Sequence, residues 1–119
     1  MQIVLDHDRI FGALGDATRR DIVRRAIDGK EGVAELAAHY PMSFAAVQKH
    51  VAVLERAGLV TKDQRGRERL VRTDVAVVGR ARHALDELEA TWRGRVDRMS
   101  DLLAQGTERA KDSTTRGAG

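Results

Sequence analysis

Apolar residues recur at helical spacing in four short segments of the first half of the chain. The first segment covers residues 6 to 14, and either Asp6 or Asp8 is expected to cap its start. The second segment begins directly after Asp16, another residue suited to an N-cap, and stops at Gly29. The pattern therefore predicts two short helices in succession.

The next two segments have the spacing of a helix-turn-helix. A short third helix, marked by Val33, Leu36 and Ala37, is expected to end at Pro41, because a proline disfavours helical geometry in the residue before it. The fourth helix has Ser43 as its expected N-cap and Gly58 as the residue that follows its end. Its apolar residues lie on one face, which is expected to be buried, and are Val47, Val51 and Leu54.

Two short β-prone runs follow the fourth helix, at residues 59 to 62 and 69 to 73. Gly66 lies between them and can adopt a positive φ, which favours a tight turn. The fold class predicted from these elements is mainly α with a small β-hairpin.

Helical periodicity returns from Val75 to about Leu103, and Gly94 lies within this segment, where it can bend or interrupt the helix. The apolar stripe of this segment consists of Val78, Leu85, Leu88, Trp92, Val96, Met99 and Leu103. It is longer than a small core can cover, so we expect part of it to pack against another chain. Residues 105 to 119 are small, polar and unpatterned, so we expect one domain over residues 1–104 followed by a disordered tail.

Composition narrows the possible functions. The chain has 119 residues, enough for one modest core, and its net charge of +3 is matched by the basic excess of residues 62 to 72 alone. A local basic strip favours a polyanionic partner. Cysteine is absent, which excludes disulfides, thiolate metal sites and cysteine nucleophiles. No signal peptide or membrane helix is predicted, so a cytoplasmic location is expected.

The polar side chains of the fourth helix have the chemistry needed to read DNA. Gln48 can form two hydrogen bonds with an adenine edge, and Phe44 or Ala45 can contact a thymine methyl group. Ser43 and Lys49 can hold phosphates. The alternative interpretation is a solvated polar face on an ordinary helix.

Two further sets of residues adjoin this face. His50 lies near the buried edge of the apolar stripe, so we expect a structural role, hydrogen bonded within the helix pair or to a phosphate. The basic residues of the hairpin are expected to contact the DNA backbone or a minor groove, and they are Lys62, Arg65, Arg67 and Arg69.

Four stretches resemble the ArsR/SmtB-type winged-helix repressors of bacteria. They are GALGDATRRDIV, VAELAAHYPMSFAAVQKHVAVLERAGLV, the Gly66-Arg67 hairpin and ATWRGRVDRMSDLL. Gln48 and Phe44 depart from the pattern of the family at positions where bases would be read, so the resemblance implies DNA binding without giving the operator sequence. The resemblance implies a winged helix-turn-helix that binds double-stranded DNA and represses transcription, including that of its own promoter.

The resemblance also implies a homodimer on a palindromic operator, built through the first and last helices. Half-sites are then expected about one helical turn apart, or a multiple of it. The residues expected at the dimer interface are Ile10, Phe11, Leu85, Leu88, Trp92, Val96 and Met99.

Many members of the family sense metals, which gives one alternative function, a metal-responsive repressor. The cysteine site of such members is missing. His83 and Glu87 are the candidate ligands, to which a dimer could add Asp74 or His7, and two ligands fall short of the four that structural zinc takes, so no cofactor is predicted. The last helix resembles a branch that lacks obvious metal ligands. The chain has no phosphate-binding glycine loop and no nucleophile elbow, so it is not expected to be an enzyme. A winged-helix module that binds proteins in place of DNA is the other alternative.

Overall fold

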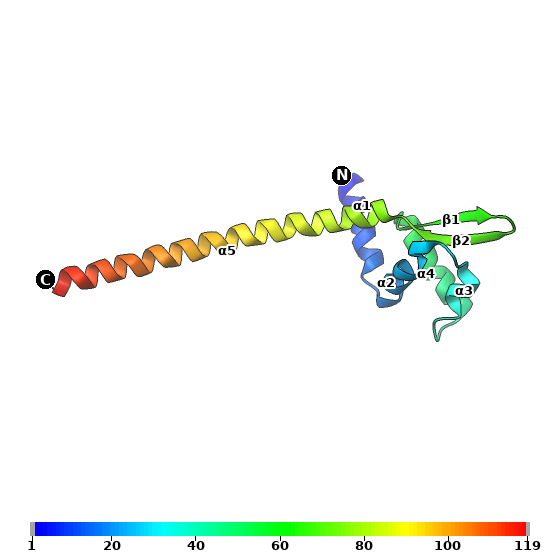
Figure 1. Ribbon diagram of the computed structural model, residues 1–119, viewed down its shortest axis with the longest axis horizontal. Helices are drawn as coiled ribbons and strands as arrows, with labels where there is room; N and C mark the ends of the chain where they lie inside the picture. Colours follow the sequence, from blue (N-terminus) through cyan, green and yellow to red (C-terminus); the bar gives the residue numbers. More distant parts are fainter. Residues whose placement is uncertain (1, 119) are drawn as a thin grey trace. The chain divides into compact units, whose positions relative to one another are not determined.

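The computed structural model describes the backbone of residues 2–118 and the side chains of residues 7–106. The predicted fold class, mainly α with one antiparallel hairpin, is confirmed (Figure 1). The elements in chain order are α1 (Gln2–Leu14), α2 (Ala17–Arg25), the 3-10 helix η1 (Ala26–Asp28), α3 (Val33–Ala37), α4 (Phe44–Arg56), β1 (Val60–Arg65), β2 (Glu68–Thr73) and α5 (Val75–Ala118).

The start of α1 differs from the prediction. The helix begins at Gln2, so Asp6 and Asp8 lie inside it and do not cap it. An aspartate favours a helix start without enforcing one, and residues 2 to 5 contain no glycine or proline that would stop the helix earlier.

The last helix is longer than predicted. It is continuous through Gly94, since a single interior glycine costs only about 1 kcal/mol relative to alanine, and it ends at Ala118. Its backbone is therefore helical over the expected tail, where the side chains beyond residue 106 lie outside the described part. The domain boundary at residue 104 stays a prediction. No helix in the described chain is long and apolar enough to cross a membrane.

The chain divides into two compact units, one ending at Arg82 and one beginning at His83 within α5. The core of the first unit is aliphatic. Its buried residues include the whole expected stripe of α4 and are Ile10, Ala13, Ile22, Val23, Ala26, Leu36, Val47, Val51, Leu54, Leu59, Val60, Val71, Val77 and Ala81.

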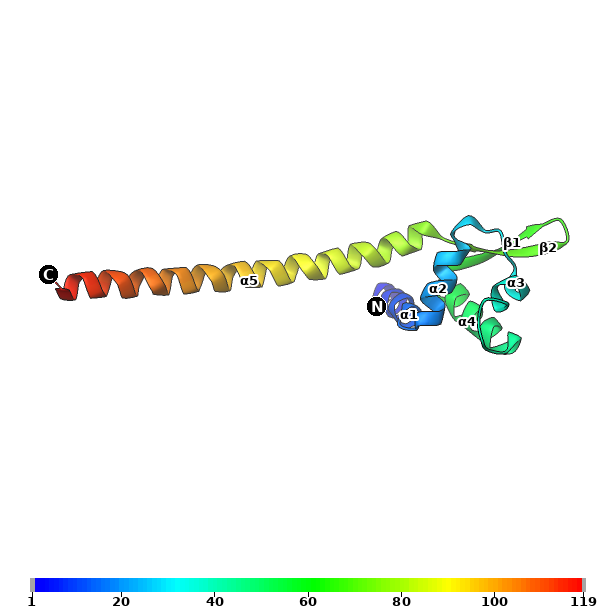
Figure 2. The same ribbon diagram turned by 60° about the horizontal axis from the view of Figure 1, so that its bottom comes forward.

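The hairpin projects away from the helices of the first unit (Figures 1 and 2). Its strands pair in register from Val60 with Thr73 to Arg65 with Glu68. The two-residue turn between them has Gly66 at φ +63°, the conformation that a primed hairpin turn requires. At the base, the buried Thr73 hydroxyl donates to the Val23 carbonyl at 2.6 Å, which fixes the hairpin on α2.

Candidate nucleic-acid interface

The ends of α4 are set by the residues that the sequence indicated. The Ser43 hydroxyl accepts a hydrogen bond from the Ala46 amide at 3.1 Å, so Ser43 is the N-cap. At the other end Gly58 has φ +76°, and the amide of Leu59 donates to the Leu54 carbonyl at 2.9 Å. This is a Schellman motif, and it directs the chain from α4 into β1.

The two faces of α4 separate as predicted. Val47, Val51 and Leu54 are fully buried, while Ala45, Gln48 and Lys49 are exposed on the opposite side. Phe44 at the start of the helix is 48% exposed, which is unusual for a large apolar ring and leaves it free to contact a partner. The first two turns of α4 therefore present an amide, a cation and an aromatic ring to solvent.

His50 is half-buried and faces the other helices of the unit. Its Nδ1 lies 3.3 Å from Nη1 of Arg19, near the start of α2. The contact is with α2, and not within the pair of the third and fourth helices that the sequence suggested. Its partner Arg19 was not identified from the sequence, because 31 positions separate the two residues and no local pattern connects them.

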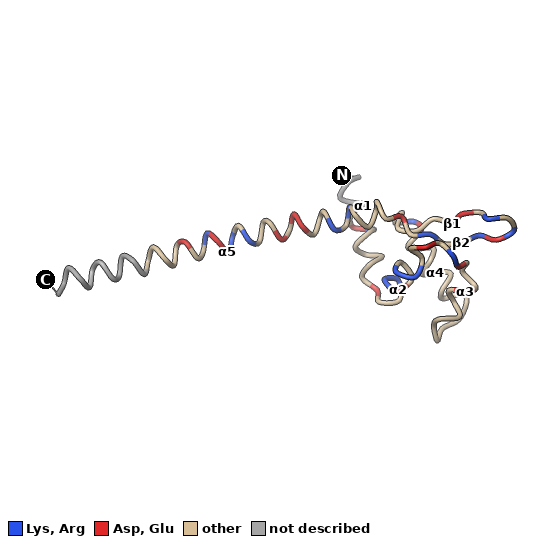
Figure 3. Tube along the Cα trace, in the orientation of Figure 1, with Lys and Arg blue, Asp and Glu red and all other residues tan. Residues whose placement is uncertain are grey.

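The basic residues of the hairpin differ in what they contact. Lys62 is half-buried and its Nζ lies 3.9 Å from Glu55 Oε1 of α4, so it links the hairpin to the helix. Arg72 pairs with Asp63 at 3.2 Å. The side chains of Arg65, Arg67 and Arg69 are exposed and form no ion pair with any residue in the described part of the chain. Figure 3 shows this basic charge at the hairpin tip, where an external anion can reach it.

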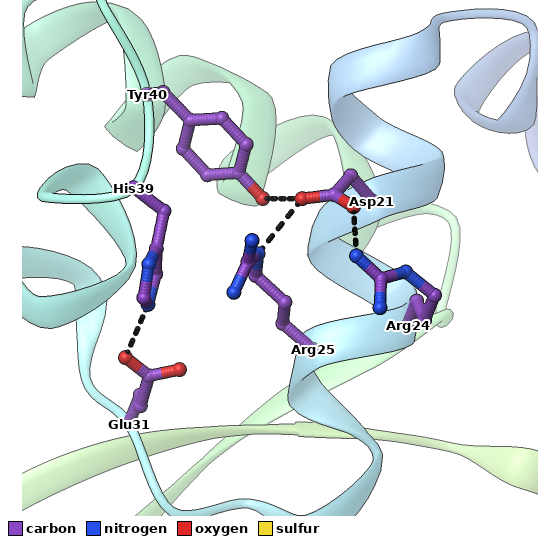
Figure 4. Close-up of polar contacts among 6 residues, drawn as sticks. All are labelled: Asp21, Arg24, Arg25, Glu31, His39 and Tyr40. Carbon is purple, nitrogen blue, oxygen red and sulfur yellow. Dashed lines mark hydrogen bonds and ion pairs between the residues drawn. The ribbon is translucent and has the colours of Figure 1, made fainter.

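A polar cluster joins α2 to the turn between α3 and α4 (Figure 4). Asp21 accepts hydrogen bonds from the Tyr40 hydroxyl at 2.6 Å and from Arg25 Nε at 2.8 Å, and it also pairs with Arg24. The Tyr40 hydrogen bond, followed by those from Arg24 and Arg25, holds the pKa of Asp21 well below its usual range. Burial and then the hydrogen bond to Asp21 raise the pKa of Tyr40 to about 12, so the hydroxyl remains a donor.

Replacing Tyr40 with phenylalanine is expected to lower the free energy of unfolding by about 1 kcal/mol at neutral pH, because a hydrogen bond to a charged, partly exposed carboxylate is lost. Since the folded-state pKa of Asp21 is depressed, its carboxylate stays charged in the folded protein well below pH 4, so the cost of Tyr40→Phe should be nearly the same at about pH 7 and about pH 4. Urea unfolding of both proteins at these two pH values measures the difference. Arg24→Ala, which removes an exposed partner, should cost less than about 0.5 kcal/mol. A Tyr40→Phe cost no larger than that of Arg24→Ala would contradict the assignment to Asp21.

The metal ligands considered in the sequence do not form a closed site. His83 Nε2 lies 3.0 Å from Glu87 Oε1, and both side chains are exposed on α5. No group of three or more His, Cys, Asp or Glu side chains with metal-binding geometry occurs among the described residues. Structural zinc takes four ligands, so this pair does not fit such an ion.

A cavity of about 390 Å³ lies between α1 and the C-terminal half of α4. It is lined by Arg9, Gly12, Ala13, Val53, Arg56 and Ala57. None of these belongs to the predicted DNA contacts, and the lining contains no carboxylate, hydroxyl or imidazole. The candidate interface is therefore the exposed surface of α4 and the hairpin tip, as expected for a partner as large as a duplex.

The chain is similar to bacterial transcriptional regulators. No family model matches it. It is 40% identical over 79 residues to the HTH-type transcriptional regulator Rv2034 of Mycobacterium tuberculosis, covering 66% of this chain and 74% of that one.

Solved structures agree with this similarity. An ArsR-like transcriptional regulator from Rhodococcus sp. RHA1 has a TM-score of 0.75 at 26% identity, covering 86% of this chain and 96% of that one. The ArsR family transcriptional regulator RHA00566 has a TM-score of 0.66 at 30% identity, covering 74% and 91%. The homodimeric winged helix-turn-helix domain Mb0332 of Mycobacterium bovis shares the fold, with a TM-score of 0.58 at 23% identity, covering 76% and 83%.

Proposed function

The chain belongs to the ArsR family of winged helix-turn-helix transcriptional regulators, and on this premise we propose that it represses transcription by binding a palindromic promoter operator as a homodimer. The observation that carries the proposal is an exposed polar face on α4 beside three hairpin arginines that have no ion-pair partner among the described residues. The polar face of α4 suits contacts with base edges, and the hairpin arginines suit contacts with phosphates. A protein that binds a bacterial promoter must reach the chromosome, so the proposed location is the cytoplasm.

In this proposal α4 is the recognition helix. An α-helix fits the major groove, which is about 12 Å wide, and the first two turns of α4 carry the exposed side chains that would reach it. Gln48 is assigned to an adenine edge, Phe44 or Ala45 to a thymine methyl group, and Ser43 and Lys49 to phosphates. The hairpin is the wing, and its free arginines hold the DNA backbone or an adjacent minor groove.

The dimer is proposed from the exposed apolar stripe of α5. Five residues predicted for the interface are exposed in the second unit, namely Leu85 (54%), Leu88 (65%), Trp92 (64%), Val96 (39%) and Met99 (61%). Large apolar side chains exposed in a row indicate a contact surface. On α1, Ile10 is buried in the core of its own unit at 2% exposure, so its side chain is not available to contact a partner chain directly. Phe11 is half-buried and remains the α1 candidate.

A gel shift with the DNA upstream of the gene for this protein tests the proposal. We expect a discrete complex whose affinity falls steeply as salt rises, because phosphate contacts release counterions. No shift at low salt, where electrostatic binding is strongest, would favour a winged-helix module that binds proteins. A shift that changes on addition of zinc or a chelator would favour the metal-responsive alternative, since binding of the ion and of the DNA would then be coupled.

Replacing Gln48 with alanine is expected to reduce discrimination between the operator and a scrambled duplex by about 1 to 3 kcal/mol per half-site, because one base pair is no longer read. Lys49→Ala is the matched comparison on the same exposed face. It should weaken both duplexes by a similar factor, because a phosphate contact carries no sequence information. Fluorescence anisotropy titrations with the two duplexes measure both effects. Unchanged discrimination in Gln48→Ala would remove Gln48 from the set of base-reading residues.

A further inference from the structure

Arg19 lies where three helices of the first unit meet. From the start of α2, its Nε donates to the Ala13 carbonyl at 2.7 Å and its Nη2 to the Gly12 carbonyl at 3.1 Å, both in the last turns of α1. Its Nη1 lies 3.3 Å from His50 Nδ1 on α4. A guanidinium can only donate, so Nδ1 is the acceptor and the neutral imidazole carries its proton on Nε2. One side chain thus connects the end of α1 to the second turn of α4.

The apolar packing of α4 fixes which face of the helix is buried, and the hydrogen bond from Arg19 adds a directional contact at the edge of that face. Val47, Val51 and Leu54 are held by burial, which depends on area and has little directional preference. A hydrogen bond is directional and is lost within a few tenths of an ångström. The contact between Arg19 and His50 is therefore the more sensitive constraint on helix rotation.

The positions of His50 and Gln48 make this constraint relevant to base reading. They are two positions apart, which is about 200° around the helix, so they project on nearly opposite sides. A rotation that turns Gln48 away moves His50 by the same angle. At roughly 5 to 6 Å from the helix axis, a rotation of about 30° displaces a side chain by about 3 Å. That displacement is enough to break a contact of 3.3 Å.

We propose that Arg19 is a positioning residue for the DNA-binding helix. By bonding to two α1 carbonyls and to His50 together, it sets the rotation at which α4 presents Gln48 and Lys49. The inference rests on the proposed function, since it takes α4 as the helix that reads DNA. It assigns to Arg19 a part in DNA recognition without contact with DNA.

Substitution of His50 isolates this contact. His50→Leu removes the acceptor but leaves the bonds from Arg19 to α1 in place, and leucine is a strong helix former. His50→Asn keeps a side-chain oxygen near the position of Nδ1 and can still accept from Arg19. Arg20→Ala is the matched control, because Arg20 donates to the Leu14 carbonyl at 2.8 Å, at the same helix end, and forms no hydrogen bond or ion pair with the described residues of α4.

We expect His50→Leu to lower affinity for the DNA upstream of the gene by about tenfold. His50→Asn should recover most of this loss, and Arg20→Ala should stay within about twofold of the parent protein. Thermal unfolding of each variant shows that it is folded. If the parent protein binds this DNA and His50→Leu binds it equally well, the positioning role is overturned while the proposed function stands. If the parent binds no duplex at low salt, the proposed function is overturned and the positioning role falls with it.

The ring tautomer of His50 gives a readout that needs no DNA. Nitrogen NMR of the free protein, with the imidazole neutral, should show an unprotonated Nδ1 and a protonated Nε2. Arg19→Ala should populate the other tautomer, while Arg20→Ala should not. A protonated Nδ1 in the parent protein, or a tautomer that does not respond to Arg19→Ala, would overturn the contact on which the proposal stands.

Discussion

The double substitution Leu85→Glu and Trp92→Glu is expected to convert the protein into a monomer that has lost tight operator binding. Both side chains are more than half exposed on α5, one helical heptad apart. In a symmetric dimer each substitution acts twice. Burying a leucine contributes about 2 kcal/mol, and tryptophan contributes at least as much. The four lost side chains therefore raise the dissociation constant of the dimer by at least about 1000-fold.

Operator affinity should fall when dimerisation is lost, because a monomer cannot bind both half-sites within one complex. Linked binding typically contributes a factor of about 100 or more. Analytical ultracentrifugation measures the mass, and a gel shift on the same samples measures the affinity. Ala90→Glu is the control, since it adds the same charge to an exposed position on another face of α5. A dimer that survives both substitutions would place the interface elsewhere.

Local signals in the sequence were sufficient for much of the fold. Ser43, Gly58 and Gly66 each have a conformational role that depends on near neighbours, and each occupies its predicted place. The burial of the α4 stripe follows from helical period alone. The predicted start of α1 was wrong, because a residue suited to capping does not prevent the helix from beginning earlier. The helical backbone beyond residue 104 was not predicted, because a segment without clear apolar periodicity can still be helical.

The contacts that position the site are the part that sequence reasoning could not supply. Arg19 with His50 and Asp21 with Tyr40 join residues 31 and 19 positions apart. Nothing in local periodicity connects them, because they depend on how the helices pack. Ile10 gives the converse case. It was expected at the dimer interface, but its side chain is buried in the core of its own unit, which only the packing of the helices reveals.

Replacing Arg65, Arg67 and Arg69 together with alanine is expected to weaken binding to every DNA sequence by a similar factor. These side chains are exposed and have no acidic partner among the described residues, so their charges are available to phosphates without first breaking an ion pair. The loss should be sequence-independent because phosphate contacts position the protein and do not read bases. Gln48→Ala should instead weaken binding to the operator more than binding to a scrambled duplex, so that discrimination between the two is reduced.

The salt dependence gives the quantitative test of the wing. The logarithm of affinity falls with the logarithm of salt concentration by about 0.9 for each phosphate contact, so the slope should flatten by about one unit for every arginine contact removed. A dimer loses two contacts per substituted position, and the triple variant should therefore flatten the slope by about five units if every wing arginine contacts a phosphate. Arg72→Ala is the control on the same hairpin, because Arg72 pairs with Asp63 and should contribute little. If the triple variant has the same slope as the parent protein, the hairpin does not contact DNA phosphates and α4 binds without it.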